Sequence, residues 1–487
     1  MKNKFYITTT LPYINADPHI GFAREIIEAD VLARFHRLLG EEVFFNTGTD
    51  EHGLKIFRKA QELGMDTQKY CDEKALEFDR LKGALNLSYD NFIRTTDEAH
   101  IKAAQEFWKL CDENGYIYKK NYKIKYCVGC ELEKTDSELV DGKCPDHPNM
   151  ELEIIEEENY FFKFSAFQDK LLDLYKNNPD FVRPAKRFNE VKRFVELGLE
   201  DFSISRIKEK MPWGVPVPGD ENQVIYVWFD ALVNYISAIG WPETQEKFDK
   251  FWPGYQVCGK DNLRQQSAMW QAMLMSVNLP ASAQIFVNGF ITVNNQKMSK
   301  SLGNVISPYE MVEKFGIDGT RYLLLAGPNF GEDFDITWEK LIEKYNADLA
   351  NGLGNLVSRI IKLAEGVKDK PKVRPLESKG QTFGELGKLV EKLELGQALD
   401  YIWKIIDEDN KFIGDNKPWE LVKTDQKKFE EVMKKLLEDL NLISQLLIPF
   451  MPETSEKIKK ALNTKETKIL FQRINTKETK INTKELK

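Results

Sequence analysis

The first fifty residues constrain the fold most strongly, because two apolar stretches flank one amphipathic segment. Residues 5–10 and 43–45 have the composition of buried strands. Between them, apolar side chains recur every three or four positions from Ile20 to Leu38, as on one face of a helix, and Gly40 suits the end of that helix. A strand, a helix and a strand in this order predict the first unit of a parallel α/β sheet.

A polar loop follows each of the two strands, and the first loop contains Pro18-His19-Ile20-Gly21. Asp17 and Pro18 form a suitable N-cap and first turn, so we expect the helix to begin there. The start of a helix presents unpaired N–H groups and a positive dipole end, which favour an anion. Because ligands bind at the carboxyl ends of parallel strands, we expect a binding site at these loops, one of which carries Asp50.

A second phosphate-handling signal, Lys297-Met298-Ser299-Lys300-Ser301, follows about 280 residues later on a polar loop after another strand. A mobile loop with two lysines can close over a triphosphate and neutralise charge as pyrophosphate leaves. Each signal is weak in isolation, since basic loops and exposed histidines are common. The presence of both signals, in this order along the chain, predicts the activation of a carboxylate by ATP.

The most specific local motif is a metal knuckle formed by Cys127, Cys130, Cys144 and His147, with the spacing C-x2-C-x13-C-x2-H. Each two-residue spacer lets both flanking side chains face one tetrahedral ion. The alternative is four unrelated residues in a loop-rich segment. Four ligands without an open position predict a structural zinc ion that folds the segment and takes no part in catalysis.

Several other residues have both a functional and an ordinary interpretation. Asp50 could hold a substrate ammonium group or simply cap a turn. Trp228, Ala231 and Tyr235 could wall an apolar pocket for an unbranched side chain or belong to the core. Asn355 and Arg359 lie four apart on one predicted helix face and could read an unpaired base, with Trp419 as a stacking platform. Their ordinary interpretation is a solvated helix face and a core ring.

The composition limits the possible classes of function. The 487 residues carry a net charge of −8, which argues against binding of nucleic acid over the whole surface. We find neither a signal peptide nor an apolar run long enough for a membrane span. Six scattered cysteines fit a reducing cytosol rather than a disulfide scaffold, so we expect a cytoplasmic protein without membrane contact.

Taken together, the motifs resemble those of the class I aminoacyl-tRNA synthetases, most closely the methionyl-tRNA synthetases. The resemblance extends from Tyr6 to about Arg473. Besides the two phosphate-handling signals and the knuckle, it rests on Leu11-Pro12-Tyr13-Ile14-Asn15, Gly48-Thr49-Asp50-Glu51-His52-Gly53, Tyr226-Val227-Trp228-Phe229-Asp230-Ala231, Gly259-Lys260-Asp261 and Asn416-Lys417-Pro418-Trp419.

The resemblance implies a Rossmann-type parallel-sheet catalytic domain, split by a zinc-bearing connective insert and followed by an α-helical anticodon-binding domain. The domain boundaries that we predict are 1–113 and 223–320 for the two catalytic halves, 114–222 for the insert, 321–345 for a linking segment, 346–462 for the anticodon-binding domain, and 463–487 for a mobile Lys-rich repeat tail.

It also implies roles for individual residues. His19 and Gly21 would hold the phosphates and adenine of ATP, Gly259 and Asp261 would meet the ribose, and Lys300, helped by Lys297, would stabilise the transition state. Asp50 would bind the α-amino group of methionine. The methionine pocket would be lined by Leu11, Tyr13, Trp228, Ala231, Tyr235 and Gln266. Asn355, Arg359 and Trp419 would read the anticodon.

By this resemblance the reaction joins methionine to tRNA(Met) through methionyl-adenylate, with one structural Zn²⁺ in the chain and Mg²⁺ accompanying ATP. The chain lacks the additional C-terminal domain through which some members dimerise, so we expect a monomer.

The sequence departs from the family pattern at two positions. Phe22 stands where the signature has a second histidine, and phenylalanine cannot donate a hydrogen bond to a phosphate. Gln266 stands where the family has a histidine beside the sulfur of methionine. Phe22 therefore leaves open an alternative function, a tRNA-binding paralogue with weakened or lost catalysis. A synthetase for valine, isoleucine or leucine would need a far larger insert than about 110 residues.

Overall fold

The computed structural model describes residues 3–130, 132–134, 138–298, 303–327, 329–367, 383–464, 466 and 468–475. Residues 299–302, which include Lys300, and most of the predicted tail lie outside this described part. None of the helices within it combines the length and the apolar character that a bilayer crossing requires.

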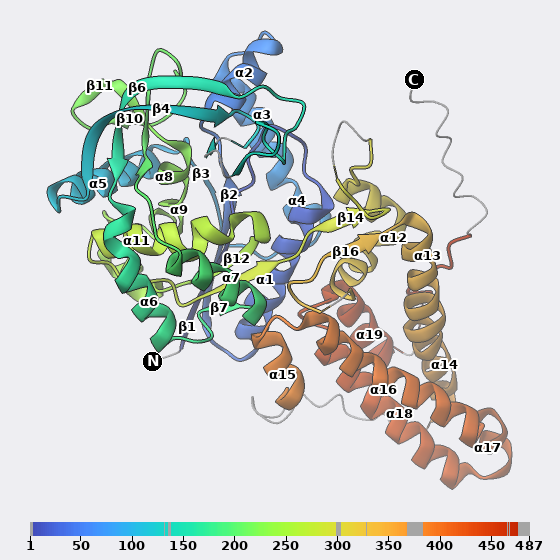
Figure 1. Ribbon diagram of the computed structural model, residues 1–487. Helices are drawn as coiled ribbons and strands as arrows, with labels where there is room; N and C mark the ends of the chain where they lie inside the picture. The colour runs from blue at the N-terminus through green and yellow to red at the C-terminus, as the bar shows by residue number, and fades with distance from the viewer. Residues whose placement is uncertain are drawn as a thin grey trace.

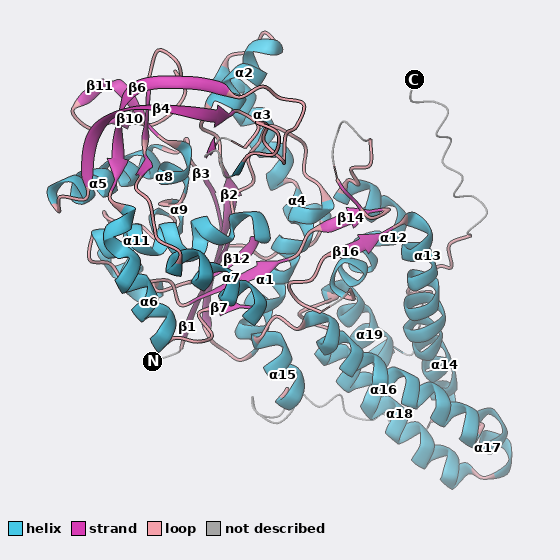
Figure 2. Cartoon of the chain, viewed as in Figure 1, coloured by secondary structure: helices cyan, strands magenta, loops and turns pink. Residues whose placement is uncertain are grey.

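The centre of the catalytic part is a parallel sheet with six strands among the described residues, in the order β3-β2-β1-β12-β13-β7 (Figure 2). The predicted strand–helix–strand unit is its core, because β1 pairs with β2 on one side and with β12 on the other. The strands are β1 (Lys4–Thr9), β2 (Glu42–Thr49), β3 (Asn91–Arg94), β7 (Val182–Arg183), β12 (Tyr255–Gly259) and β13 (Gln284–Asn288).

Alternating side chains of β1 explain why helices cover both faces of this sheet. Phe5 and Ile7 belong to one apolar cluster together with α1 (Ile20–Leu38), whereas Tyr6 belongs to a second cluster on the other face. The second cluster includes side chains of α5 (Glu98–Glu113), α9 (Asn234–Ser237) and α11 (Trp270–Ser276). The peripheral helices of the first catalytic half are α2 (Leu54–Glu62), α3 (Thr67–Asp79) and α4 (Leu81–Ala84).

The first helix begins later than the sequence predicts. His19, not Asp17, is the N-cap of α1, and its imidazole accepts a hydrogen bond from the backbone N–H of Gly21. Asp17 instead pairs with Lys74, 2.7 Å away. The imidazole of His19 thus takes the capping position that was predicted for Asp17. This places His19 at the positive end of the helix.

Antiparallel sheets replace the parallel sheet between β3 and β12. One has the strand order β5-β4-β6-β8 and another the order β10-β11-β9. The strand β11 (Asp220–Ile225) ends where the chain turns into α8, which begins at Val227. The strands are β4 (Ile117–Cys127), β5 (Leu132–Lys134), β6 (Glu153–Phe162), β8 (Phe202–Ser203), β9 (Ser205–Ile207), β10 (Pro216–Val217) and β11 (Asp220–Ile225).

One short strand of the predicted insert, β7, returns to the edge of the parallel sheet beside β13. The helices between β6 and β13 are α6 (Gln168–Asn177), α7 (Ala185–Glu196), α8 (Val227–Ala231), α9, α10 (Gln245–Phe251) and α11. After β13 comes a three-stranded sheet of β14 (Ile291–Val293), β15 (Gln296–Lys297) and β16 (Phe334–Ile336). Between β15 and β16 runs α12 (Pro308–Leu325).

The remaining chain is helical and extends away from the sheet, with α17 at its far end (Figure 1). We refer to α13–α19 as the helical region. Apolar side chains at helical spacing are buried at Leu349, Leu353, Leu356, Ile360, Leu436, Leu440, Ile443, Leu446 and Leu447, whereas Leu363 is half-buried. The helices are α13 (Trp338–Lys344), a π-helical stretch η6 (Tyr345–Gly354), α14 (Asn355–Leu363), α15 (Gly384–Glu391), α16 (Leu395–Asn416), α17 (Pro418–Thr424), α18 (Gln426–Leu446) and α19 (Pro452–Thr464).

Part of the predicted tail packs on the helical region. Phe471 is 8% exposed, and its ring centroid lies 6.0 Å from that of Tyr345. Asn346 donates to the carbonyl of Ile474 at 2.8 Å and accepts from its N–H at 2.9 Å. A stretch between two polar repeats is thus fixed by one aromatic and one amide contact.

Candidate active site

A cavity of about 440 Å³ opens at the carboxyl end of the parallel sheet. It lies beside β1 and β12, where the chain order of the sheet reverses, which is the usual ligand position in such sheets. Twelve of the predicted ATP- and methionine-binding residues line it: Leu11, Tyr13, His19, Gly21, Asp50, Trp228, Ala231, Tyr235, Gly259, Asp261, Gln266 and Lys297. Lys300, the remaining predicted residue, lies outside the described residues.

The cap of α1 fixes the tautomer of His19. Its Nδ1 accepts from the N–H of Gly21 at 3.0 Å, so the neutral ring carries its proton on Nε2. The surrounding protein atoms lower the pKa of His19, whereas the charge of Asp261 acts in the opposite direction. A neutral imidazole that donates from Nε2 can bind a phosphate oxygen without a counter-charge.

The two phosphate-handling signals meet in this cavity. A Cβ at Gly21 would lie 2.8 Å from Cε1 of His19, so glycine makes room for the histidine cap, and Cε of Met298 on the loop would lie 3.7 Å from the same point. Lys297 is exposed, and its Nζ lies 4.7 Å from the ring centroid of Phe290. The helix tip and the described end of the lysine loop therefore face the same space.

A second glycine permits a close turn at the end of β12. A Cβ at Gly259 would lie 2.6 Å from Oδ1 of Asp261. Glycine thus lets the Asp261 carboxylate fold back along the strand end, beside the cavity. The adjacent Lys260 is held away by Asp333, whose two carboxylate oxygens lie 2.7 and 2.8 Å from its Nζ.

The apolar wall of the cavity ends in a chain of neutral amides. Gln266 donates from Nε2 to the hydroxyl of Tyr235 at 2.5 Å and accepts from Nε2 of Gln256 at 2.9 Å. Ser282 in turn donates to Gln256 at 2.5 Å, and Gln271 donates to Ser282 at 3.1 Å. This chain of contacts fixes the amide orientation of Gln266, so that the hydroxyl of Tyr235 accepts from it and keeps its own proton for another acceptor.

Asp50 is 8% exposed and directly follows β2. A short bridge joins its backbone to that of Tyr13, since the N–H of Asp50 donates to Pro12 at 3.0 Å and the N–H of Ile14 donates to Asp50 at 3.3 Å. The loop that carries Asp50 is thus held against the loop that follows β1.

A buried histidine–aspartate–histidine cluster holds a helix that carries cavity-lining residues. Asp230 on α8 lies 2.6 Å from Nδ1 of His52 and 2.9 Å from Nε2 of His100. Burial acts to raise the pKa of Asp230, but the contacts with both histidines hold it at about 2. The ionised carboxylate fixes α8, and with it Trp228 and Ala231, against the Asp50 loop.

Cys127, Cys130, Cys144 and His147 form a cluster that could hold a metal ion. Their ligand atoms all lie within 4.8 Å of one another. The Sγ atoms of Cys130 and Cys144 are 3.4 Å apart, close to the edge of roughly 3.8 Å that tetrahedral zinc–thiolate geometry requires. A Cβ at Gly129 would lie 2.5 Å from the ring of His147, so this glycine is needed for the close turn. The donor set therefore fits a four-coordinate ion.

The predicted anticodon residues lie at the helical region, far from the cavity (Figure 1). Arg359 on α14 places its guanidinium carbon 5.9 Å from the ring centroid of Trp419 on α17. The indole of Trp419 is 43% exposed, and Asn355 is exposed one turn before Arg359. The structure thus brings the predicted aromatic platform and the predicted polar pair together.

Family models match nearly the whole chain. The model for class I tRNA synthetases (M) matches residues 5–153 and 148–361, and the model for the anticodon-binding domain of methionyl tRNA ligase matches residues 373–482. The chain belongs to the methionyl-tRNA synthetase family.

Relatives of this family are similar over most of their length. The methionine–tRNA ligase of Thermotoga maritima is 43% identical over 479 residues, which cover 95% of this chain and 76% of the relative. That of Brucella suis is 41% identical over 471 residues, which cover 94% and 91%. The structure of the Mycobacterium tuberculosis methionyl-tRNA synthetase in complex with methionyl-adenylate has a TM-score of 0.88 and 38% identity, with coverage of 94% and 93%.

These similarities do not favour the alternative of a non-catalytic paralogue, which rested on Phe22. The structure gives that residue an apolar environment: Phe22 is 8% exposed, and its ring packs edge-on against Phe78, with centroids 5.7 Å apart. In this methionyl-tRNA synthetase family member, Phe22 thus takes part in an apolar contact and supplies no hydrogen-bond donor to the cavity.

Among the residues that line the cavity but that sequence reasoning missed are Glu25, Lys55 and Asn288. Glu25 accepts from the N–H of Thr10 at 2.9 Å and from its hydroxyl, and burial raises the pKa of Glu25 to about 8. Glu25 lies within the first two turns of α1. The periodicity of the apolar residues assigns its position to the exposed face of that helix. Only the return of the loop after β1 over α1 buries it.

Proposed function

We propose that this protein joins methionine to its tRNA in two steps. ATP and methionine first give methionyl-adenylate and pyrophosphate, and the 3′-terminal adenosine of tRNA(Met) then takes the methionyl group. The observation that carries this proposal is the shared cavity, in which both phosphate-handling segments lie beside an apolar wall. Membership of the methionyl-tRNA synthetase family supports it.

The proposed roles at the phosphates follow from charge and geometry. In the first step, a carboxylate oxygen of methionine attacks the α-phosphorus of ATP in line with the leaving pyrophosphate. Catalysis of this step is mainly positioning and stabilisation of charge. We assign phosphate contacts to the Nε2–H of His19 and to Gly21. Stabilisation of the transition state falls to Lys297 with Lys300, and ribose contacts fall to Gly259 and Asp261.

The proposed methionine subsite uses the rest of the cavity. Asp50 pairs with the α-ammonium group, which its buried carboxylate suits. Leu11, Tyr13, Trp228 and Ala231 bound the side chain, while Tyr235 and Gln266 lie at its far end. The Nε1–H of Trp228 has no hydrogen-bond partner within the described part of the chain, so a bound ligand can accept from it.

We assign zinc to the cluster of three cysteines and His147, where it would be structural because all four positions are protein ligands. Mg²⁺ would accompany ATP and neutralise phosphate charge. None of the six cysteines, all of which lie in the described part of the chain, forms a disulfide, which agrees with a cytoplasmic protein, and we expect it to act as a monomer. Asn355, Arg359 and Trp419 would contact the anticodon.

The test is methionine-dependent exchange of labelled pyrophosphate into ATP, measured with each of the twenty amino acids. Exchange with methionine alone supports the proposal. Exchange with another amino acid would identify that amino acid as the substrate. Absence of exchange with all twenty would leave only the tRNA-binding alternative.

A further inference from the structure

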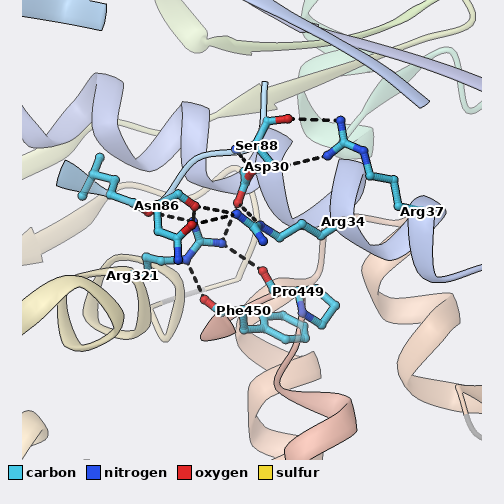
Figure 3. Close-up of polar contacts among 9 residues, drawn as sticks. Asp30, Arg34, Arg37, Asn86, Ser88, Arg321, Pro449 and Phe450 are labelled. Carbon is cyan, nitrogen blue, oxygen red and sulfur yellow. Dashed lines mark hydrogen bonds and ion pairs between the residues drawn. The ribbon is translucent and has the colours of Figure 1, made fainter. Parts of the chain in front are cut away.

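One buried arginine joins the catalytic sheet to the helical region. Nη2 of Arg321, on α12, lies 2.8 Å from Oδ2 of Asp30, on α1, and both side chains are 0% exposed (Figure 3). The two residues are about 290 positions apart in the chain. Such a pair is costly to bury, so its surroundings must supply further hydrogen bonds.

Those hydrogen bonds come from the turn between α18 and α19. Arg321 donates from Nε to the carbonyl of Phe450 at 2.8 Å and from Nη2 to that of Pro449 at 2.9 Å. Its Nη1 donates to the carbonyl of Leu85 at 3.1 Å. One guanidinium therefore contacts α1, the chain after α4 and the helical region at the same time (Figure 3).

Asp30 completes the cluster from the other side. Its Oδ1 accepts from the N–H of Ser88 at 2.7 Å and from the hydroxyl of Ser88 at 2.6 Å, while Arg34 lies 2.7 Å from Oδ2. Burial acts to raise the pKa of Asp30, but Arg321 and Arg34 outweigh it and the pKa is lowered. One carboxylate thus serves two guanidinium groups, and both of its oxygens accept hydrogen bonds or ion pairs.

The second half of α12 contacts the helical region at another point. Gly316 has a φ of 71° and kinks α12, so that the residues after it turn toward α19. Oδ2 of Asp318 accepts from the N–H of Thr454, in the first turn of α19, at 2.5 Å. Both ionic side chains that follow the kink therefore bind the start of α19 or the turn before it.

The same two helices meet again at the cavity. The N–H of Ile20, the first residue of α1, donates to the carbonyl of Ile306, directly before α12, at 3.1 Å. His19 caps α1, and the loop with Lys297 leads into α12. Asp30 lies eleven positions beyond His19, or about 16 Å along the helix. Thus α1 and α12 carry the phosphate-handling segments at one end and share the Asp30–Arg321 pair farther along.

We propose that Arg321 is a positioning residue for adenylate formation: it fixes α1 and α12 to each other and to the α18–α19 turn, and thereby sets the spacing between His19 and the lysine loop. This inference rests on the proposed function, because it assigns both segments to one ATP. A displacement of about 1 Å between reacting groups can cost about 10²-fold in rate, so small shifts of these helices matter.

The methionine subsite lies on other elements, namely the loops after β1 and β2, helices α8 and α9, and the helical stretch after β12 that carries Gln266. A change at Arg321 should therefore lower kcat of methionine-dependent pyrophosphate exchange without changing KM for methionine. If the Asp30–Arg321 pair were purely structural, the variant would instead give fewer folded molecules, each with unchanged kcat.

The experiment compares Arg321→Met, Arg321→Lys and the wild type, with kcat expressed per active site from titration of the adenylate burst. Arg321→Met should lower kcat about tenfold to a hundredfold, with KM for methionine within about twofold. Arg321→Lys keeps the charge beside Asp30 but loses the planar fork toward Phe450 and Pro449, so kcat should be intermediate.

Arg37→Met is the matched control. Arg37 projects from α1, the partner helix of the pair, and binds Ser88 and Asp90, at 2.6 and 2.7 Å, but no contact of it with the α18–α19 turn occurs among the described residues. Its kcat should stay near that of the wild type.

Wild-type kcat in folded Arg321→Met, or an equal loss in the control, would overturn the inference. Failure of both Arg321 variants to fold would also overturn it, because the pair would then be purely structural. Absence of exchange in the wild type would refute the proposed function instead.

Discussion

The catalytic cavity and the tip of the helical region are built in opposite ways. The cavity collects short loops from several strand and helix ends, and buried polar contacts, such as those of Asp230 and Gln266, fix them. At the tip, one exposed indole lies beside one arginine on two neighbouring helices. Buried networks preorganise chemistry, whereas an exposed ring can adapt to a base. The two regions should therefore respond differently to substitution.

The largest expected effect is at His19. His19→Ala removes the only side-chain cap of α1 and the Nε2 donor, so kcat of pyrophosphate exchange should fall about 10²–10³-fold. Binding of tRNA, measured by filter retention, should stay within about twofold. Equal losses in exchange and in tRNA binding would mean that the two regions are not separable.

The next effect concerns the contribution of the cavity residue Glu25 to the free energy of unfolding. The pKa of Glu25 in the folded protein is about 8, above its ordinary value of 4.5, so the folded state binds this proton more tightly than the unfolded state. The stabilisation is complete below about pH 4.5 and is lost as the pH rises through about 8. Glu25→Gln stays neutral, so its free energy of unfolding should decrease less than that of the wild type between pH 5 and 8.5, by roughly 4 kcal/mol.

Urea unfolding of Glu25→Gln and the wild type at both pH values measures this difference. Glu453→Gln is a suitable control, since that carboxylate lies at the surface of α19 and pairs only loosely with Lys457, at 3.4 Å. Parallel pH profiles for Glu25→Gln and the wild type would show that Glu25 is ionised in the folded protein.

At the tip, Trp419→Ala should affect only the RNA step. Loss of one base–aromatic contact costs about 1–3 kcal/mol, so kcat/KM for charging of tRNA(Met) should fall about tenfold to a hundredfold. Pyrophosphate exchange, which needs no tRNA, should be unchanged. If exchange fell as much as charging, Trp419 would have a structural rather than an RNA-binding role.

The smallest effect is expected at Gln266. Gln266→Leu leaves the amide of Gln256 and the hydroxyl of Tyr235 without their shared partner, which should raise KM for methionine about threefold to tenfold. Gln266→Glu, which keeps the shape but cannot donate from that end when ionised, serves as the comparison. Wild-type KM in both variants would show that the amide chain does not shape the pocket.

The sequence predicted those features that depend on local pattern. The strand–helix–strand unit, the cysteine spacing and the residues at strand ends each leave a signal within a few tens of residues, and they lie together in the structure. The anticodon residues had no such signal, and only the resemblance to a family distinguished them from an ordinary solvated face.

Other features depend on contacts that no local pattern encodes. The helix starts at Ile20 because the imidazole of His19 can reach the N–H of Gly21, which side-chain preferences for capping do not predict. Glu25 is buried against a loop that follows a strand, and Asp30 meets Arg321, about 290 positions later in the chain, only in the folded protein. From the sequence alone, Glu25 and Asp30 are recognisable only as charged residues within a largely apolar helix. Thr10 and Arg321, their partners in these contacts, lie on other segments of the chain.

The central claim is that the tip of α1 and the lysine loop bind one nucleotide beside methionine. The most direct measurement is a crystal structure of this protein with a non-hydrolysable analogue of methionyl-adenylate. We predict that the phosphate analogue lies within hydrogen-bond distance of Nε2 of His19, with the ribose at Asp261 and the thioether against Trp228 and Tyr235. Density for the analogue outside this cavity, with His19 and Lys297 both remote from it, would contradict the account.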